Sequence, residues 1–543
     1  MRGFSAVNEI KELAATAFRG EGQERQRDDL EALVPLAQSH KYGMLSPLLG
    51  RLARVAGEGG DLLASLRLLN LQGRALRITG EWDAAEAAYN EALDKCSEAQ
   101  AYERGCAYSG LATLKGYRGE YEDALQDLAH AMKHARNADS PALQALYKCQ
   151  QAGIFSRTGD QSRARNLLDE ALEAVAESED EACRYVRSQA SLGHGLHAFR
   201  EGDLTRAEEH MGQALSLLSE DDYPVERGEV LRYLGVIKGA LGQNAEAMRC
   251  LVAALRLFRE AGYTYGQART YNSIGRTFLQ STRLEEAIFY MEKGVRICRE
   301  LRAEAELATV YGKIGNAYML CEDYGRAVHY LLQDLELSNR FKNYYALGYT
   351  HRNLGRCYTM GGNLEDGIQH LNESLGLFQF VEDSANTARV YIDLCQANTE
   401  RGKLQDARQF GQKALNLLTG HKMKMEAAYA HVVLGGIERR LGNLDASTMH
   451  LSEAMPDLET AGKSSRLAEA FYETGQLAAD RGEREKAFQN LERALQCAKE
   501  LGLKKHATRC FAVMEHLGDL ELLQLLSRDM EDRGKKTPAE AKA

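Results

Sequence analysis

The sequence predicts an all-α solenoid of about eleven helix-turn-helix repeats with atypical end caps. A short motif that begins with glycine returns at nearly constant spacing along most of the chain. Between successive motifs the apolar residues follow the i, i+3, i+4 spacing of amphipathic helices. Only 6 of the 543 residues are proline, which permits many uninterrupted helices, while 49 glycines supply points where helices end or approach one another closely.

The recurring motif divides the chain into repeats, and we call its first residue the anchor. It reads GEWDAA at Gly80, GDLTRA at Gly202 and GEREKA at Gly482. From residue 202 to residue 482 successive anchors are 40 residues apart, even where the anchor is not glycine. The spacing of the motif is therefore better preserved than its residue types. The anchors are Gly80, Gly119, Gly159, Gly202, Gly242, Thr282, Glu322, Gly362, Gly402, Gly442 and Gly482.

Two further signatures place two helices in each repeat. A Leu-Gly or Ile-Gly pair recurs with its glycine seven residues before the anchor, as in Ile274-Gly275, and an alanine recurs twelve residues after it, as in Ala254. We expect the anchor glycine to end the first helix in a left-handed conformation. We expect the small residues to let neighbouring helices approach closely.

This order of Leu-Gly, Gly-x-aromatic, Ala and Ala-Leu resembles the tetratricopeptide repeat (TPR) family over residues 61–500. The repeats here have 40 residues, longer than the usual 34, and are similar in length to those of the LGN/Pins polarity adaptors. The resemblance implies a right-handed superhelix and a helical scaffold that binds a segment of a partner. It implies no cofactor.

The two ends differ from the repeats. Residues 1–60 have helix-like apolar segments with a poor signature, and we expect an N-terminal helical cap. Residues 501–527 carry a degenerate copy of the motif and are expected to form C-terminal capping helices, because the last hydrophobic face of an array must be shielded. The polar, charged residues 528–543 are expected to be disordered.

Composition argues against several classes of function. The formal net charge of −10 disfavours binding to nucleic acid, which requires a basic surface. No stretch approaches 18 unbroken apolar residues, so we expect no membrane insertion. The first residues lack the pattern of a secretory signal. The number of cysteines, 11, is odd, and they are scattered along the chain, so the sequence predicts reduced thiols and a cytoplasmic location.

No motif predicts catalysis, a cofactor or a metal site. The segment Ala461-Gly462-Lys463-Ser464 looks like the end of a phosphate-binding loop, but Asp457 stands where that loop needs its first glycine. Gly262, Gly462 and Gly502 also share one position in the 40-residue period, which indicates a turn between repeats. His130 and His134 lack the glutamate of an HExxH site. We therefore expect a protein that is not an enzyme.

The family resemblance also predicts a partner-binding groove. In TPR superhelices the first helix of each repeat faces the concave side, with inward residues thirteen, ten, six, three and two positions before the anchor. Transferred to this chain, these positions give six arginines and four other polar or aromatic residues on one strip, with Glu229 as the main opposing charge. The strip consists of Arg232, Arg269, Asn272, Arg276, Asn316, Tyr349, Arg352, Arg356, Arg389 and Gln396.

Arginine and asparagine on a concave surface favour an acidic or extended peptide as the partner. Guanidinium groups pair bidentately with carboxylates, and asparagine both donates to and accepts from a peptide backbone. The alternative is that these arginines form ion pairs with Glu or Asp on neighbouring helices. The sequence leaves both possibilities open.

Two functions fit these observations. The first is a non-catalytic adaptor that holds an acidic or extended segment of a partner protein in its groove. The second is a regulatory sensor whose superhelix changes shape when a peptide or partner binds. Assembly into a homo-oligomer through the end caps is a third possibility, and the sequence does not identify the partner.

Overall fold

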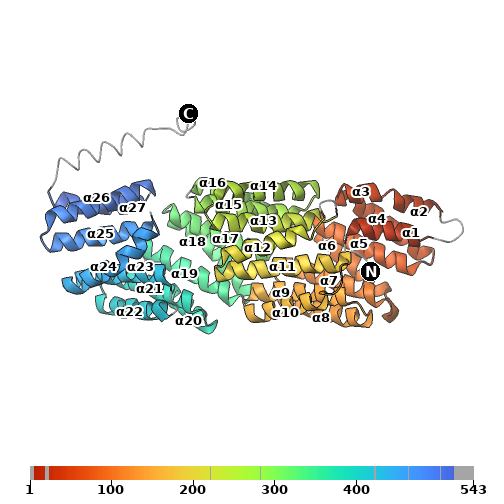
Figure 1. Ribbon diagram of the computed structural model, residues 1–543, viewed down its shortest axis with the longest axis horizontal. Helices are drawn as coiled ribbons and strands as arrows, with labels where there is room; N and C mark the ends of the chain where they lie inside the picture. The colour runs from red at the N-terminus through yellow and green to blue at the C-terminus, as the bar shows by residue number, and fades with distance from the viewer. Residues whose placement is uncertain are drawn as a thin grey trace, which may run out of the picture. The chain divides into compact units, whose positions relative to one another are not determined.

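The computed structural model describes residues 5–18, 24–219, 222–281, 283–420, 423–462, 464–501 and 503–518 of the chain. These residues form helices and contain no strand (Figure 1). The chain divides into an N-terminal body, Met1–Leu347, and a C-terminal body, Gly348–Ala543, with the division inside helix α19. The predicted tail, 528–543, and residues 519–527 of the predicted C-terminal cap lie outside the described residues.

The N-terminal body begins with four helices that precede the first repeat, and seven repeats follow. The four are α1 (Ala6–Thr16), α2 (Glu24–Glu31), α3 (Val34–Gln38) and α4 (Tyr42–Glu58). The repeats contain α5 (Leu62–Thr79), α6 (Trp82–Lys95), a 3₁₀ turn (Glu98–Gln100), α7 (Ala101–Arg118), α8 (Tyr121–Asn137), α9 (Pro141–Thr158), α10 (Gln161–Ala174), α11 (Glu181–Glu201), α12 (Leu204–Ser216), α13 (Pro224–Ala240), α14 (Asn244–Glu260), α15 (Thr264–Gln280), α16 (Leu284–Glu300), α17 (Glu304–Leu320) and α18 (Tyr324–Arg340).

The C-terminal body contains the last four repeats and one further helix. Its helices are α19 (Tyr344–Met360), α20 (Leu364–Phe380), α21 (Ser384–Glu400), α22 (Leu404–Gly420), α23 (Lys424–Arg440), α24 (Leu444–Thr460), α25 (Ser465–Asp480), α26 (Arg484–Glu500) and α27 (Lys504–His516). The predicted solenoid is confirmed: each of the eleven repeats holds two helices, which we call its A helix and its B helix. The odd-numbered helices from α5 to α25 are A helices.

A regular step of twenty residues underlies the repeats from α13 to α24. Each of these helices has 17 residues and is separated from the next by three. The turns depend on a residue in the left-handed conformation, such as Gly242 at φ 78°. In that turn the Gln243 N–H donates to the Lys238 carbonyl at 2.9 Å, which satisfies an acceptor that the helix end would leave unpaired.

The predicted anchors occupy these turns. The nine glycine anchors all have positive φ, and the non-glycine anchor Glu322 adopts the same conformation at φ 61°. The other degenerate anchor, Thr282, lies outside the described residues. The turns between repeats follow the same rule: Gly262 and Gly462 are left-handed, as expected for a turn and not for a phosphate loop, while Gly502 is outside the described residues.

The A and B helices of a repeat approach closely where their side chains are small. A Cβ added at Gly355 in α19 would lie 2.8 Å from the carbonyl oxygen of Gly367 in α20 and 2.6 Å from the side chain of Leu371. The residues five positions after the anchors complete this contact, and eight alanines there have no exposed surface. They are Ala85, Ala124, Ala207, Ala247, Ala287, Ala327, Ala407 and Ala487.

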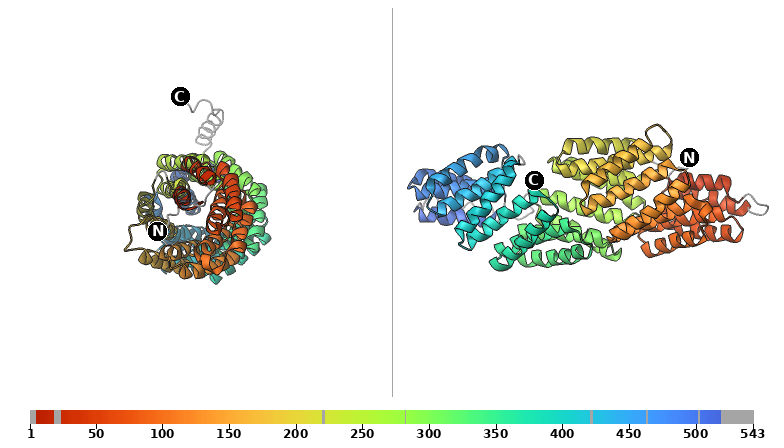
Figure 2. Two further views of the ribbon diagram at one scale, coloured as in Figure 1. Left: turned by 90° about the vertical axis from the view of Figure 1, so that its right-hand side faces the viewer. Right: turned by 90° about the horizontal axis from the view of Figure 1, so that it is seen from below.

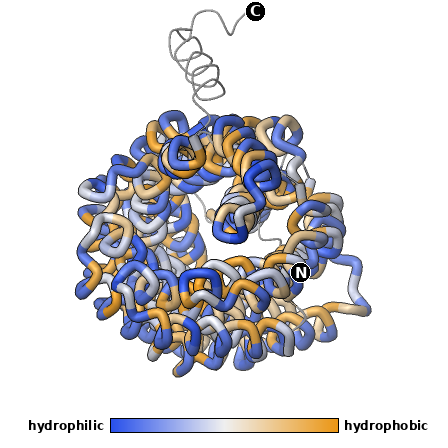
Figure 3. Tube along the Cα trace, turned by 90° about the vertical axis from the view of Figure 1, so that its left-hand side faces the viewer, coloured by the Kyte–Doolittle hydropathy of each residue, from blue (hydrophilic) through white to orange (hydrophobic). Residues whose placement is uncertain are grey.

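The apolar core runs along the repeats as a chain of clusters, each shared by neighbouring helices. One cluster in the N-terminal body joins Leu128 and Met132 of α8 to Leu143 and Tyr147 of α9. Figure 3 shows hydrophobic and hydrophilic residues alternating along the helices, as expected for helices with one buried face. Each repeat therefore depends on its neighbours for burial.

The N-terminal body curls until its early repeats meet its late ones. Helix α5 contacts α15, and α7 contacts α17, although about 200 residues separate them. Figure 2 shows the helices of this body, coloured from red to green, following one another around a ring. This contact encloses the inner side of the A helices between α5 and α17.

Two histidine pairs link A and B helices in the C-terminal body. The Nδ1 atoms of His351 and His370 are 3.0 Å apart, and those of His431 and His450 are 2.9 Å apart. Such a contact requires one ring nitrogen to accept, so at least one ring is neutral. Burial lowers the pKa of all four imidazoles, and for His351 and His450 the paired histidine lowers it further.

We predict that Gly355→Ala destabilises the protein by about 1–3 kcal/mol, because the added methyl group overpacks the contact between the A and B helices. Gly376→Ala is the matched control, since a Cβ at this exposed glycine of α20 meets nothing within 4 Å. That control should stabilise the protein by about 0.5–1 kcal/mol. Thermal unfolding followed by circular dichroism measures both, and a Gly355→Ala variant as stable as the control would contradict the close packing.

We also predict that the protein loses stability as the pH falls below about 6.5, the ordinary pKa of histidine. Because the folded pKa values are lowered, the unfolded chain binds more protons in this range, and protonation favours unfolding. The double variant His370→Gln/His450→Gln should melt with a weaker dependence on pH between 5 and 7.5. Identical slopes of melting temperature against pH for both proteins would refute the role of the pairs.

Candidate functional site

The inner wall of the N-terminal body is formed by side chains of its A helices. Contacts between A helices that are not neighbours identify this side, because only the inside of a curved array brings them together. The guanidinium group of Arg276 in α15 lies over the ring of Phe199 in α11, 5.1 Å from its centre. Arg157 of α9 interacts electrostatically with Tyr265 and Arg269 of α15.

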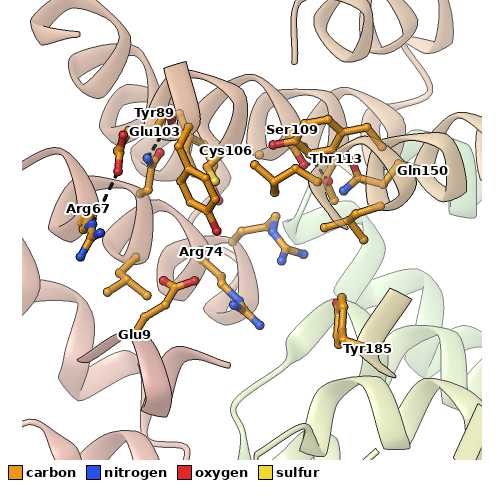
Figure 4. A pocket seen from close by; sticks show the side chains of 18 of the residues that line it. Glu9, Arg67, Arg74, Tyr89, Glu103, Cys106, Ser109, Thr113, Gln150 and Tyr185 are labelled. Atoms are coloured by element: carbon orange, nitrogen blue, oxygen red, sulfur yellow. Dashed lines mark hydrogen bonds and ion pairs between the residues drawn. The ribbon is translucent and has the colours of Figure 1, made fainter. Parts of the chain in front are cut away.

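A cavity of about 170 Å³ opens between α1 and the inner wall of the first repeats. It is lined by Arg67, Asn70, Arg74 and Arg77 of α5, by residues of α7 and α9, and by Glu9 and Glu12 of α1. Figure 4 shows Glu9, Arg67 and Arg74 on one side of this cavity, with Ser109, Thr113 and Gln150 on the other.

Helix α1 lies against this wall. Its residues Val7, Ile10 and Leu13 are buried. Asn8 donates from Nδ2 to both carboxylate oxygens of Glu181 in α11 at 2.8 Å, and Arg67 donates to Glu12 at 3.2 Å. A segment of the chain itself therefore bridges A helices that belong to the first and fourth repeats.

The charges around the cavity are balanced. Arg67 also lies 3.5 Å from Glu103, and Arg74 lies 3.5 Å from Glu226 of α13. Burial works to lower the pKa of Arg74, but Glu226 and Glu9 outweigh it and raise that pKa. Acidic residues from α1, α7 and α13 thus pair with the arginines of α5.

Aromatic residues hold the early and late repeats together. Trp82, the single tryptophan of the chain, is 3% exposed and packs against Tyr117 and, edge to face, against Tyr265 with ring centres 5.6 Å apart. The hydroxyl groups of Tyr117 and Tyr263 are 3.2 Å apart, and Arg77 donates to Tyr117 at 2.9 Å. We call Trp82, Tyr117, Tyr263 and Tyr265 the aromatic contact.

Farther along the wall, two predicted groove residues share one carboxylate. Arg232 donates to Glu229 from Nε at 3.1 Å and from Nη2 at 2.8 Å, and Arg269 donates to the other oxygen of Glu229 at 3.0 Å. Burial works to raise the pKa of Glu229, but Arg232 and Arg269 hold it below its usual value. Arg269 also donates to the Tyr233 hydroxyl at 2.7 Å.

The two predicted asparagines differ in their partners. Asn272 is 1% exposed and donates to Glu306 at 2.7 Å, while its Oδ1 atom has no hydrogen-bond partner. The structure assigns no hydrogen bond to the side chain of Asn316, which is partly buried in α17. Of the two amides, Asn272 is therefore already engaged in the wall.

Arg276 differs from the other five predicted arginines. Within the described parts of the chain it forms no ion pair, and burial lowers its pKa. Lys313, which interacts electrostatically with Arg276, also forms no ion pair within the described parts of the chain. Burial lowers the pKa of Lys313 to about 8, although Glu306 works to raise it.

The remaining predicted residues belong to the C-terminal body. Arg352 forms a short contact with Asp393, which also lies 3.7 Å from Arg356, and Arg389 lies 2.9 Å from Glu426. Gln396 donates to the Tyr429 hydroxyl at 2.7 Å, and the Tyr349 hydroxyl accepts from Asn386 at 2.8 Å. These residues line one side of consecutive A helices.

Five of the six predicted arginines thus have acidic partners. For these five, the structure agrees with the alternative that they form ion pairs within the protein. The structure groups Arg232, Arg269, Asn272, Arg276 and Asn316 in one body and the other five predicted residues in the other.

The same positional rule would have found Arg67, Asn70, Arg74 and Arg77, which lie thirteen, ten, six and three positions before Gly80. The predicted strip begins at the fifth repeat and therefore omits these residues, as well as Arg157 and Arg200, each two positions before an anchor. The place of α1 on the wall has no signal in the repeat pattern.

The described residues contain no group of three or more histidine, cysteine or acidic side chains that could hold a metal ion. Their cysteines are free, and burial raises the pKa of several of them, including Cys149 to about 12, which keeps these thiols protonated. No helix within the described ranges is long and apolar enough to span a bilayer.

Comparisons with known proteins are consistent with the repeat pattern. The family model of the tetratricopeptide repeat matches residues 226–300 and 349–419. The Regulatory protein AfsR of Streptomyces griseus is 25% identical over 276 residues, a match that covers 45% of this chain and 28% of that protein. The chain thus spans less than a third of the length of this curated relative.

Similar solved structures have low sequence identity and concern the fold alone. The apo form of the quorum sensor NprR from B. thuringiensis is 14% identical, with a TM-score of 0.49 over 64% of this chain and 97% of that one. A signal transduction ATPase with numerous domains and a tetratricopeptide repeat sensor, from Pyrococcus horikoshii, is 13% identical, with a TM-score of 0.47 over 83% and 72%. The apo form of RapI is 20% identical, with a TM-score of 0.41 over 50% and 96%.

The single tryptophan makes the aromatic contact directly testable. In the wild-type protein we predict weak quenching of Trp82 fluorescence by iodide, because the indole is buried. Tyr265→Ala removes the ring packed against its edge and should increase the Stern–Volmer constant several-fold.

The control variant is Tyr391→Ala, which removes a ring stacked on Phe410 in the C-terminal body and should leave quenching unchanged. Equal quenching in the wild type and in Tyr265→Ala would show that the early and late repeats do not meet in solution.

Proposed function

We propose that this chain, which is a tetratricopeptide repeat protein, is a non-catalytic adaptor whose inner wall binds an extended, acidic segment of a partner protein. The observation that carries the proposal is an excess of positive charge on the A helices of the N-terminal body. There Arg157, Arg200, Arg276 and Lys313 have no acidic partner within ion-pair distance among the described residues, in a protein whose net charge is −10.

Buried or half-buried cations without counter-ions cost stability unless a ligand supplies the missing charge. A concave wall with low-dielectric surroundings also strengthens the field of clustered charges and speeds encounter with an anionic segment. The excess charge therefore has a physical explanation if the wall receives acidic groups from another molecule.

Helix α1 provides an internal example of the pairing of charges, although it lies on the wall as a helix and not as an extended chain. Its acidic residues Glu9 and Glu12 face the arginines of α5, and its Asn8 reaches α11 across the wall. Farther along, amide side chains such as Asn316 supply both a donor and an acceptor for the backbone of an extended chain.

A regulatory sensor is the second candidate. It is favoured by the match to a relative named as a regulatory protein and by the aromatic contact between the early and late repeats. A ligand bound to the wall would change the free energy of that contact, and the contact would change the affinity for the ligand by the same amount.

We predict that Arg276→Glu abolishes capture of the partner while the variant still folds, because Arg276 has no ion pair to lose and gives up only its contact with the ring of Phe199. Arg249→Glu, on an exposed face of the B helix α14, removes the same charge from the outside of the array and should retain the partner. Variants of Arg352 or Arg356 are less suitable because they would leave Asp393 with fewer cations.

Affinity capture with mass spectrometry, followed by mapping on overlapping peptides of the captured protein, measures both variants. The expected binding region is acidic and extended. Retention of the same partner by Arg276→Glu, or a binding region without acidic residues, would refute the proposed groove.

A further inference from the structure

We propose that the cavity between α1 and the inner wall of the first repeats binds a monosaccharide, a single neutral ring that carries adjacent hydroxyl groups. The residues that carry the proposed acidic groove, Arg157, Arg200, Arg276 and Lys313, do not line this cavity. The inference is therefore independent of the proposed function and assigns a second ligand to the N-terminal body.

The volume of the cavity limits the size of the ligand. An apolar protein cavity of about 150 Å³ holds one molecule of benzene. The slightly larger cavity here, about 170 Å³, therefore fits one six-membered ring with small substituents. A nucleoside, in which a base and a sugar are joined, exceeds this volume, whereas a single sugar ring does not.

Charges of both signs line the cavity in nearly equal number, four glutamates and three arginines. Arg67 lies 3.2 Å from Glu12, and Arg74 lies 3.5 Å from Glu226. A charged ligand would be repelled by one set of these groups, whichever its sign. A hydroxyl group instead accepts from a guanidinium group and donates to a carboxylate at the same time. Adjacent hydroxyl groups on a neutral ring therefore match this lining.

The side of the cavity opposite Arg67 and Arg74 offers neutral hydrogen-bonding groups (Figure 4). The Oε1 atom of Gln150 accepts from the Ser109 hydroxyl at 2.9 Å, while its Nε2 atom donates to no residue of the described ranges. The Thr113 hydroxyl donates to the carbonyl of Ser109 in its own helix at 2.9 Å, which leaves its oxygen able to accept. A ligand hydroxyl can therefore accept from Gln150 and donate to Thr113.

One residue of the lining departs from the repeat pattern. Tyr89 of α6 lies nine positions after its anchor, where nine of the other ten repeats have leucine or methionine and one has glycine. Its ring is 3% exposed and packs against Gly73 of α5, where an added Cβ would lie 2.7 Å from Cε1, and against Gly110 of α7. The ring thus passes between two A helices, and its hydroxyl reaches Arg77. Tyr89 adds a polar group to the cavity that the usual leucine lacks.

Apolar side chains of the same cavity provide a surface for the ring carbons. They include Leu71 of α5, Tyr102 of α7, and Leu143 and Leu146 of α9. The C–H face of a sugar ring is apolar and packs on aromatic and aliphatic side chains, while the hydroxyl groups at its rim meet the polar residues. The cavity thus combines an apolar surface with donors and acceptors around it.

The test is saturation-transfer-difference NMR on the full chain. The monosaccharide probes are glucose, galactose, mannose and N-acetylglucosamine, and the comparison probes are adenosine and glutamate. We expect at least one monosaccharide to bind, adenosine to be excluded by its size and glutamate by its charge. Absence of binding by all four monosaccharides, or tighter binding of adenosine or glutamate, would overturn the proposal.

Two variants assign the binding to this cavity. Tyr89→Leu introduces the residue that most other repeats have, and it should fold because Leu251 packs against Gly235 in the same way in the fifth repeat. Thr113→Val removes a hydroxyl whose hydrogen bond within the protein stays inside its own helix. Each variant should weaken binding of the tightest monosaccharide at least about fivefold, the effect of losing one hydrogen bond.

The matched control is Thr474→Val in α25 of the C-terminal body. Its hydroxyl also donates to the carbonyl four residues earlier in its own helix, at 2.8 Å, and its loss should leave the affinity unchanged. Melting temperatures verify that all three variants fold. A monosaccharide that binds the wild type, Tyr89→Leu and Thr113→Val equally well would lie elsewhere on the protein, and this result would overturn the site.

Discussion

The left-handed residue that recurs every twenty positions is the constraint on which the other features depend. From α13 to α24 it ends each helix after 17 residues and sends the chain back along the previous helix, so the crossing points of successive pairs fall at the same place in each of these repeats. Glycine and alanine can then occupy those points, as at Gly355 and Ala287. Glu322 adopts the required conformation without being glycine, which shows that the packing of the repeat outweighs the local preference of one residue.

The same regular step concentrates charge on the inner wall. Curvature brings A helices that are two or three repeats apart within reach of one another, so Arg276 lies over Phe199 and Arg157 interacts with Arg269. Along the wall the balance of charge changes. Around α5 the arginines are matched by acids of α1, α7 and α13, whereas toward α17 the cations outnumber Glu229 and Glu306. The charges of the wall are thus balanced near α5, whereas positive charge is in excess near α17.

Much of the fold could be predicted from the sequence because helix ends and close helix contacts require particular small residues, such as Gly242 and Ala247. The side of the helix on which Arg232 or Arg389 lies could also be inferred from its distance to the anchor. Their partners could not, because Glu229 and Glu426 come into reach only through the packing of neighbouring helices. The position of α1 and the meeting of Trp82 with Tyr265 depend on the pitch of the whole body, which no single repeat encodes.

The aromatic contact around Trp82 has a topological consequence. With α5 against α15 and α7 against α17, the early and late repeats of the N-terminal body meet across the ring. A partner segment that binds the inner wall at this level has to pass a free end through the ring or separate the rings of Trp82 and Tyr265. The association rate would then depend on how often this contact opens, whereas the affinity would be set by the charges of the wall.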